Sequence, residues 1–363
     1  MDTTSNLSIK RYPSTTNKSL QAWNAGDEFI LQKLGEMNLT GKNISIYNDR
    51  FGYLSCHLNT HNPKIITHRK SQEKSIKMNL EDNQLQANAD RWLTPFSQLS
   101  NSDICLLQIP KSLDLFKHFL HKISSTLSDD GTVICAFMTK YFTPSLLEIA
   151  NDYFEEVEQS LAQKKSRLLV LKKKKPLPDI NFLNTINYSF DEENPEELKQ
   201  YPGVFSSGNI DYATQFLMDT ININKDEPTV LDLGSGNGVI ARYVQKRYPE
   251  AELHLMDDSI LAIESSKLNL DENNTHFHWE DSLENITTGF DLILSNPPFH
   301  FGHETNIEVS LKLFSEVAKA LKPNGRFVCV ANQHLNYKVH LEKMFTSVDI
   351  LSQNKKFIIY QIS

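Results

Sequence analysis

The sequence has few cysteines and no long apolar run, and both absences restrict what the protein can be. Its 363 residues include four cysteines, scattered through apolar surroundings, namely Cys56, Cys105, Cys135 and Cys329. Cysteines without paired spacing indicate reduced core side chains rather than a disulfide framework. No stretch approaches the roughly 18 to 20 apolar residues that span a membrane, and the first residues lack a basic-then-apolar secretory pattern. We therefore expect no membrane association and a cytoplasmic location.

Three common ligand signatures are also missing. The sequence has no Walker lysine, no G-x-G-x-x-G spacing, and no cluster of histidine or cysteine at metal-ligand spacing. These absences argue against a phosphate-binding loop and a dinucleotide cofactor, and they predict that the protein has no metal site. The composition, with 39% hydrophobic and 23% charged residues, is that of a globular protein, and the length suggests two domains.

A glycine-rich turn follows a short apolar strand in the second half of the chain. Residues 229–231 favour a strand, and an apolar helical pattern begins at Val239. The turn between them carries the candidate cofactor-binding residues Asp232, Gly234, Ser235, Gly236 and Gly238. Glycines let the backbone turn sharply and lie against a ligand with no Cβ in the way. Alone this signal is weak, because dinucleotide enzymes and ordinary turns use similar sequences.

Two carboxylates follow later strands of the same half. Residues 253–256 predict a strand that ends at Asp257, whose carboxylate can accept hydrogen bonds from two vicinal ribose hydroxyls. Asp281 follows an apolar stretch, in a place where a side chain would reach an adenine amino group. The alternatives are a solvated turn or a helix cap for Asp257 and Asp258, and a capping aspartate for Asp281. The pattern favours a ligand with a nucleoside end.

The segment Asn296, Pro297, Pro298 and Phe299 is the sharper signal, and we predict that it is catalytic. It ends the apolar run 290–295, and the two prolines forbid both helix and ladder pairing, so the chain leaves the sheet in a rigid extended form. The Asn296 amide oxygen and a proline carbonyl can both accept hydrogen bonds from one exocyclic amino group. Phe299 offers a flat face to a planar base or amide. The alternative is a plain turn that ends the strand.

A cofactor that donates a methyl group suits this pair of motifs. A sulfonium methyl needs neither a metal nor a phosphate cradle, so S-adenosylmethionine is the expected cofactor. The enzyme would then contribute alignment, desolvation and hydrogen bonds rather than a strong base. His300 and His303 flank the proposed site, and a general-base role for either of them is the alternative.

Further segments resemble the ribosomal RNA large-subunit methyltransferase G family, guanine-N2 methyltransferases related to the small-subunit enzyme C. The resemblance lies in segments 11–13, 20–23, 27–28, 48–52, 204–206 with Asp211, and 331–337. It implies methylation of a guanine in 23S ribosomal RNA. It also implies that Phe299, Asn332 and Tyr337 bind substrate, with loop packing as the alternative for the last two. The family more often has cysteine at Ser235.

The sequence also contains a weak internal repeat. Residues 44–58 align with 230–244, and three later segments align at offsets of 190, 188 and 194 residues. We predict an α/β protein with two tandem Rossmann-like class I methyltransferase domains, of which the N-terminal copy is degenerate. In that copy Asn48, Arg50 and Phe51 replace Gly234, Gly236 and Asn237, and residues 108–111 replace the Asn-Pro-Pro-Phe segment. The first copy should therefore be inert.

Charge separates the two halves. Residues 1–185 hold 23 basic and 19 acidic residues, whereas residues 186–363 hold 14 and 26. We expect the first domain, 1–185, to dock ribosomal RNA for the catalytic domain, 186–363. The cluster Lys172 to Lys175 is the best local candidate, with a solvated strand end as the alternative. The overall acidity argues against tight nonspecific nucleic-acid binding. A proline-containing, acidic stretch from 176 to 201 indicates the boundary.

Alternating helix and strand are expected in the second half. Helices are predicted over 211–220, 259–269 and 309–321, and strands over 229–233, 253–256, 290–295, 326–330, 347–351 and 357–361. A parallel sheet covered on both faces would bring the glycine turn and Asn296 to the same edge.

Other functions stay open at this stage. The Asn-Pro-Pro-aromatic motif also serves methylation of adenine-N6 in DNA and of glutamine side chains in proteins. The choice between a 16S and a 23S ribosomal RNA target rests on resemblance alone. A ribosome assembly factor without activity suits residues 1–185 but not the second half, where both motifs are intact. Protein partners remain unknown from the sequence.

Overall fold

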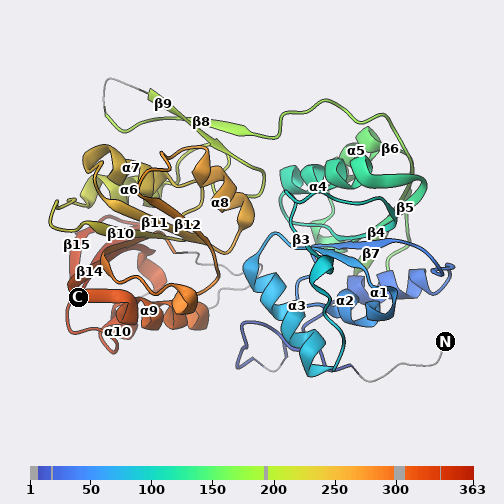
Figure 1. The fold of residues 1–363 in the computed structure, drawn as a ribbon, viewed down its shortest axis with the longest axis horizontal. Coiled ribbons are helices and arrows are strands. Elements are labelled where there is room, and N and C mark those ends of the chain that lie inside the picture. Colours follow the sequence, from blue (N-terminus) through green and yellow to red (C-terminus); the bar gives the residue numbers. More distant parts are fainter. Residues whose placement is uncertain (1–6, 18, 192–194, 298–306, 336) are drawn as a thin grey trace. The chain divides into compact units, whose positions relative to one another are not determined.

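The computed structural model describes residues 7–17, 19–191, 195–297, 307–335 and 337–363, with side chains of the helix that begins at Ile307 described from Lys312 onward. Two compact units make up the chain, Met1–Phe182 and Leu183–Ser363. Each unit contains a seven-stranded, mostly parallel sheet, and the second also has a two-stranded hairpin. Figure 1 shows helices on both faces of each large sheet. The α/β class and the tandem arrangement of Rossmann-like sheets are confirmed.

The first unit has the sheet order β3-β2-β1-β4-β5-β7-β6. Its strands are β1 (Ile44–Tyr47), β2 (Lys64–Ile66), β3 (Trp92–Leu93), β4 (Ser102–Gln108), β5 (Leu127–Met138), β6 (Phe154–Gln159) and β7 (Ser166–Lys174). Its helices are α1 (Ala25–Leu34), α2 (Tyr53–His57), α3 (Lys70–Asp82), α4 (Leu113–Thr126) and α5 (Pro144–Tyr153), with 3-10 turns at Asn59–His61, Ala89–Arg91 and Thr139–Tyr141.

The second unit repeats that topology as β12-β11-β10-β13-β14-β16-β15. Its strands are β8 (Asn184–Ser189), β9 (Pro195–Gln200), β10 (Thr229–Leu233), β11 (Glu252–Asp257), β12 (Thr275–Trp279), β13 (Phe290–Ser295), β14 (Leu321–Asn332), β15 (Val348–Gln353) and β16 (Phe357–Ile362). Its helices are α6 (Tyr212–Thr220), α7 (Val239–Arg247), α8 (Ile260–Lys267), α9 (Ile307–Ala320) and α10 (Lys338–Leu341), with 3-10 turns at Leu283–Asn285 and Gln333–Leu335. Strands β14, β16 and β15 pair antiparallel, and the other neighbours in the large sheet pair parallel.

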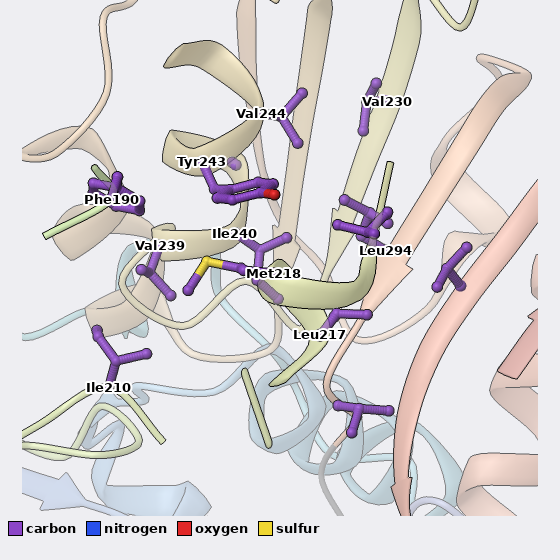
Figure 2. Packing of buried hydrophobic residues seen from close by; sticks show 14 of the residues in the cluster. Phe190, Ile210, Leu217, Met218, Val230, Val239, Ile240, Tyr243, Val244 and Leu294 are labelled. Carbon is purple, nitrogen blue, oxygen red and sulfur yellow. The ribbon is translucent and has the colours of Figure 1, made fainter. Parts of the chain in front are cut away.

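The core of the second unit follows from strand alternation. Val230 and Leu294 point to the face covered by α6 and α7, whereas Leu231 and Ile293 point to the face covered by α9. Figure 2 shows the first of these layers, in which Leu217 joins side chains of α7 against the sheet. Burial on both faces explains why central strands such as β13 are mostly apolar rather than alternating.

Most expected elements of the second unit lie within a few residues of the observed ones, and three expectations need correction. The acidic stretch before Tyr201 is a hairpin of β8 and β9 in the second unit, where Ile186 and Leu198 are buried in the core. Strand β14 begins at Leu321 rather than Arg326, directly after α9, with an irregular pairing opposite β13. Strand β12 was not among the expected strands, because histidines interrupt its apolar pattern.

Candidate active site

The predicted site residues gather where the parallel strands of the second sheet end. Strand β10 lies between β11 and β13, so the glycine turn after Leu233 is flanked by Asp257 on one side and Asn296 on the other. Asp281 comes two residues after β12, the next strand outward. Ligands of open α/β sheets bind at this edge, so topology brings together residues that are far apart in sequence.

The glycine turn is held by backbone hydrogen bonds to the neighbouring strand. The Gly234 and Ser235 amides donate to the Met256 carbonyl at 2.8 and 3.1 Å. Gly236 has a φ of +56°, and a Cβ built on it would meet nothing within 4 Å. The turn therefore leaves open space beside Gly236, where a ligand can lie directly against the backbone.

Gly238 is required for a different reason. Its φ is +78°, and a Cβ there would come within 2.7 Å of Leu270 Cδ1 and 3.1 Å of Ser266 Cβ. Gly238 is the N-cap of α7, so this contact sets how closely α7 approaches the chain around α8. Glycine is the residue that satisfies both the left-handed conformation and the close packing.

We expect Gly238→Ala to lower the free energy of unfolding by about 2 to 4 kcal/mol, because left-handed strain and overpacking add. Gly236→Ala has the same strain but open space, so about 1 kcal/mol is expected. Gly208→Ala is the matched control, since nothing lies within 4 Å of its Cβ position. Urea unfolding of the three variants measures the difference. A Gly238→Ala protein as stable as Gly208→Ala would contradict this account.

Asp232 is a buried carboxylate with one oxygen in use. Its Oδ2 accepts the Ala241 amide at 3.0 Å, which ties the end of β10 to α7. Burial is the main cause that raises the pKa of Asp232 to about 7, and the nearby charge of Asp257 raises it further. Within the described residues, Asp232 Oδ1 and Ser235 Oγ are buried without a hydrogen-bond partner. Two unsatisfied polar atoms beside the open turn are what a polar ligand would satisfy.

Asp257 bridges the turn and the next helix. Its Oδ2 accepts the Gly236 amide at 3.0 Å, and its Oδ1 accepts the Ser259 amide at 2.8 Å, one residue before α8. A carboxylate oxygen can accept more than one hydrogen bond. The helix-start alternative and the ligand-binding prediction are thus compatible. The neighbouring Asp258 differs, because its backbone carbonyl accepts from the Trp279 indole at 2.8 Å.

Asn296 is oriented by two residues near the start of α6. Its Nδ2 donates to Asp211 Oδ2 at 3.2 Å and to Thr214 Oγ1 at 2.9 Å. An ionised carboxylate only accepts, so the amide nitrogen must face Asp211 and the amide oxygen must face away from it. The preceding Ser295 donates to the Leu233 carbonyl at 2.7 Å, which fixes the end of β13 beside the glycine turn.

The role of Asp211 and Thr214 in orienting Asn296 was not foreseen from the sequence. Asp211 is also the N-cap of α6, where its side chain accepts the Ala213 amide. The signal available in the sequence was an aspartate before a predicted helix, which is typical of any N-cap. Nothing in such a cap indicates that the same carboxylate reaches a strand end 85 residues later.

The remaining predicted site residues have different outcomes. Pro298, Phe299, His300 and His303 lie outside the described residues. Asn332 ends β14 at the same sheet edge and is half-buried. Tyr337 is buried, and its ring packs against Phe314 at a centroid distance of 5.4 Å, as in the loop-packing alternative. Substrate contact by Asn332 and Tyr337, and cofactor contact by Asp281, stay predictions.

In the first unit, the equivalent sheet edge is filled by its own side chains. Asn48 is left-handed like Gly234, and its side chain bonds both the Gln108 carbonyl, at 2.7 Å, and Gln72. The register of the two sheets shows that Thr67 has the same position in the first unit as Asp257 has in the second. The Phe51 ring is buried beneath two guanidinium groups. Among its described residues, this edge has neither the glycine turn nor a carboxylate at the position of Asp257.

The four cysteines are buried and free, as expected. Burial raises the pKa of the Cys56 and Cys105 thiols to about 12. These thiols stay protonated at neutral pH and are poor nucleophiles. No helix in the described part of the chain is long and apolar enough to cross a membrane.

Three side chains of the types that bind metal ions lie together on β11 and β12, although the sequence analysis predicts no metal. Glu252, His254 and His276 each offer one ligand atom, and these three atoms lie within 4.8 Å of one another. Burial, and then the neighbouring His278, lowers the pKa of His254 to about 4. The group was missed because His276 is 22 residues after His254 and meets it only through the pairing of β11 with β12. The available signal was glutamate or histidine at alternate positions, 252 with 254 and 276 with 278.

Comparison with known proteins gives consistent results for both units. Residues 1–175 match the model of the RLMG N-terminal domain, and residues 196–361 match the methyltransferase small domain. The ribosomal RNA large subunit methyltransferase G of Shewanella sp. strain MR-4 is 32% identical, over 98% of this chain and 96% of that protein. The protein of the same name from Psychromonas ingrahamii is 31% identical, over 97% and 95%.

A solved structure shares the whole two-unit fold. It is a T. thermophilus 16S rRNA N2 methyltransferase in complex with AdoMet and guanosine, 20% identical, with a TM-score of 0.77 over 94% of this chain and 92% of that one. At this identity, the likeness concerns the fold alone.

Proposed function

The chain belongs to the ribosomal RNA large subunit methyltransferase G family, and we propose that it transfers a methyl group from S-adenosylmethionine to the N2 amino group of a guanine in 23S ribosomal RNA. The observation that carries this proposal is the meeting of the open glycine turn, Asp257 and an oriented Asn296 at one sheet edge. We expect the protein to act in the cytoplasm, on ribosomal RNA.

The residues of the glycine turn suit S-adenosylmethionine. The open space at Gly236 admits a ligand against the backbone, and Asp232 Oδ1 and Ser235 Oγ are buried acceptors without a partner among the described residues. The carboxylate of Asp257, which ends β11 beside the glycine turn, suits a ribose diol. Asp281 is proposed to reach the adenine amino group. When bound, the cofactor supplies an electrophilic methyl group and needs no metal.

Asn296 is proposed to position the nucleophile. Its amide oxygen and the Pro297 carbonyl would accept the two hydrogens of one exocyclic amino group, which leaves the nitrogen lone pair directed at the methyl donor. Asp211 and Thr214 hold the amide nitrogen, so the oxygen is presented before substrate arrives. Preorganised acceptors of this kind stabilise the charge that develops on the nitrogen.

The guanine must leave its stack to reach this site. A base within a folded RNA cannot present its amino group to Asn296, so the substrate is an extruded base or one from a single-stranded loop. Phe299, Asn332 and Tyr337 are proposed to form the base pocket, with Phe299 as the stacking face.

We propose that the first unit docks RNA and has no activity of its own. Its excess of basic residues and its filled sheet edge support this role. The lysine cluster in β7 is partly neutralised, since Lys173 pairs with Glu156 and Lys174 with Asp129. Docking would therefore rest on the overall positive balance of the unit rather than on this cluster alone.

The direct test is to incubate the protein with labelled S-adenosylmethionine and separated, unmodified 16S and 23S ribosomal RNA, and then to identify the labelled nucleoside. We expect N2-methylguanosine in 23S RNA. Label in 16S RNA alone would assign the protein to the small-subunit reaction. No label in either RNA, nor in assembled subunits, would remove ribosomal RNA as substrate and direct the test to DNA or protein acceptors.

A further inference from the structure

The second sheet carries a group of three histidines and one glutamate away from the proposed active site. Strands β11 and β12 pair in parallel, with His254 opposite His276 and Met256 opposite His278. Because side chains alternate along a strand, Glu252 and His254 share a face with their neighbours His276 and His278. The active-site residues occur at the carboxyl ends of these strands, and Asp257 is three residues beyond His254. At about 3.3 Å per residue, the two groups are about 10 Å apart along the strand.

The spacing of the ligand atoms is that of a metal site. Glu252 Oε1 lies 3.4 Å from His254 Nε2 and 3.3 Å from His276 Nε2. Two ligands bound to one tetrahedral zinc, each at 2.0 to 2.1 Å, would be about 3.3 to 3.4 Å apart. The two histidine rings have centroids 4.6 Å apart, so both nitrogens can face the same point.

A further contact orients the central ligand. His254 Nδ1 lies 2.9 Å from His278 Nε2, and Phe290 packs edge-on against the His254 ring. Metal-bound histidines usually use the second ring nitrogen in such a hydrogen bond, which fixes the tautomer and the direction of the ligating nitrogen. The other nitrogen of His254 is the one that faces Glu252.

Exposure of the three ligands allows a cation to enter. The His254 side chain is 5% exposed, whereas Glu252 and His276 are 49% and 50% exposed. One ligand is thus buried in the protein, and two are half-exposed, Glu252 at the start of β11 and His276 on edge strand β12. Two imidazoles and one carboxylate favour zinc and similar divalent transition metals over magnesium or calcium.

We propose that Glu252, His254 and His276 bind one Zn²⁺ ion, with His278 positioning His254. The ion joins β11 to β12 and so stabilises the pair of strands that lead to Asp257 and Asp281. This inference is independent of the proposed methyl transfer, because binding is measured without cofactor or RNA. Without a metal, His254 lies at hydrogen-bond distance from Glu252 and His278, and Glu252 also contacts His276.

The test uses the untagged full chain, because a polyhistidine tag would itself bind the probe. After treatment with a chelator and its removal, Zn²⁺ is titrated by calorimetry, and thermal unfolding is recorded with and without Zn²⁺. We expect one equivalent to bind and to raise the melting temperature. The exposed residues are the ones to change, since His254 is part of the core. His276→Gln and Glu252→Gln should each weaken Zn²⁺ binding at least about 10-fold. Loss of His278, which supports the ligand His254, should weaken it as much.

His57→Gln is the matched control, because His57 is exposed and belongs to the first unit. It should bind Zn²⁺ as the unchanged protein does. Absence of a bound equivalent in the unchanged protein would overturn the proposal and leave only the contacts of His254 with Glu252 and His278. Equal affinity in His276→Gln, Glu252→Gln and the unchanged protein would overturn it as well, because the ion would then lie elsewhere.

Discussion

Asn296→Ala is expected to lower the rate of methyl transfer about 100- to 1,000-fold and to leave S-adenosylmethionine binding almost unchanged. Removal of one preorganised hydrogen-bonding group from an active site has effects of this size, because the group acts on charge that develops in the transition state. The Asn296 side chain contacts Asp211 and Thr214 rather than the glycine turn, so the cofactor side of the site keeps its contacts.

Two measurements on the same protein separate these effects. Transfer of labelled methyl to RNA gives the rate, and calorimetry without RNA gives the cofactor affinity. Asn285→Ala is the control, because Asn285 is an exposed asparagine of a 3-10 turn that pairs with Glu280. Equal loss of cofactor binding in Asn296→Ala would show that Asn296 supports the cofactor rather than the substrate.

Asp211→Asn tests the orientation of the same amide with little effect on folding. Asparagine caps a helix as well as aspartate does, so α6 should keep its N-cap. The new amide oxygen can still accept from Asn296, but it is neutral, and the amide nitrogen beside it can donate, so the contact no longer fixes the nitrogen side of Asn296. We expect a rate about 10-fold lower, with unchanged cofactor affinity, since roughly 1.4 kcal/mol corresponds to one charged hydrogen bond.

The fold of the second unit could be predicted well from its sequence because each strand is short, apolar and closed by a recognisable turn. The glycine turn and the paired prolines mark the ends of β10 and β13, and the rule for parallel sheets then puts both at one edge. The internal repeat was detectable for the same reason: Gly52 and Gly238 are both left-handed N-caps of a helix, and both positions tolerate little else.

What could not be predicted depends on contacts between distant segments. The β8–β9 hairpin has charged, polar strands whose few buried residues, such as Ile186, give too weak an alternation to distinguish a strand from a linker. The histidines of β12 conceal a strand for a similar reason. Likewise, no local pattern shows that Asp211 reaches Asn296, or that Glu252 reaches His276, because both contacts require the register of the sheet.

Asp257→Ala should have the opposite effect to Asn296→Ala, with cofactor affinity reduced about 10- to 100-fold and the rate at saturating cofactor much less affected. The expected loss of about 1.4 to 2.7 kcal/mol corresponds to one or two charge-assisted hydrogen bonds to ribose hydroxyls. Calorimetry with S-adenosylmethionine measures it. Asp258→Ala is the control, because the contact of Asp258 with Trp279 uses its backbone carbonyl and survives the change.

Loss of affinity in Asp257→Ala has two physical sources, because the same carboxylate also holds the Gly236 and Ser259 amides. Asp257→Asn separates them. Its amide oxygen can still accept one of these backbone amides, but it offers the ribose a neutral acceptor, so intermediate affinity is expected if the ribose contact dominates. Unchanged affinity in Asp257→Ala would remove the residue from the cofactor site altogether.

Asp257→Thr gives the second unit the residue that the first unit has at the matching position, Thr67. A threonine hydroxyl provides one neutral acceptor in place of a charged pair, so the variant should bind cofactor as weakly as Asp257→Ala. The reverse change, Thr67→Asp, should confer no binding on the first unit, because the Asn48 side chain, at the position where the second unit has Gly234, bonds Gln72 and the Gln108 carbonyl. Binding of a second equivalent of cofactor by Thr67→Asp would mean that the carboxylate alone, and not the filled turn, makes the first unit inactive.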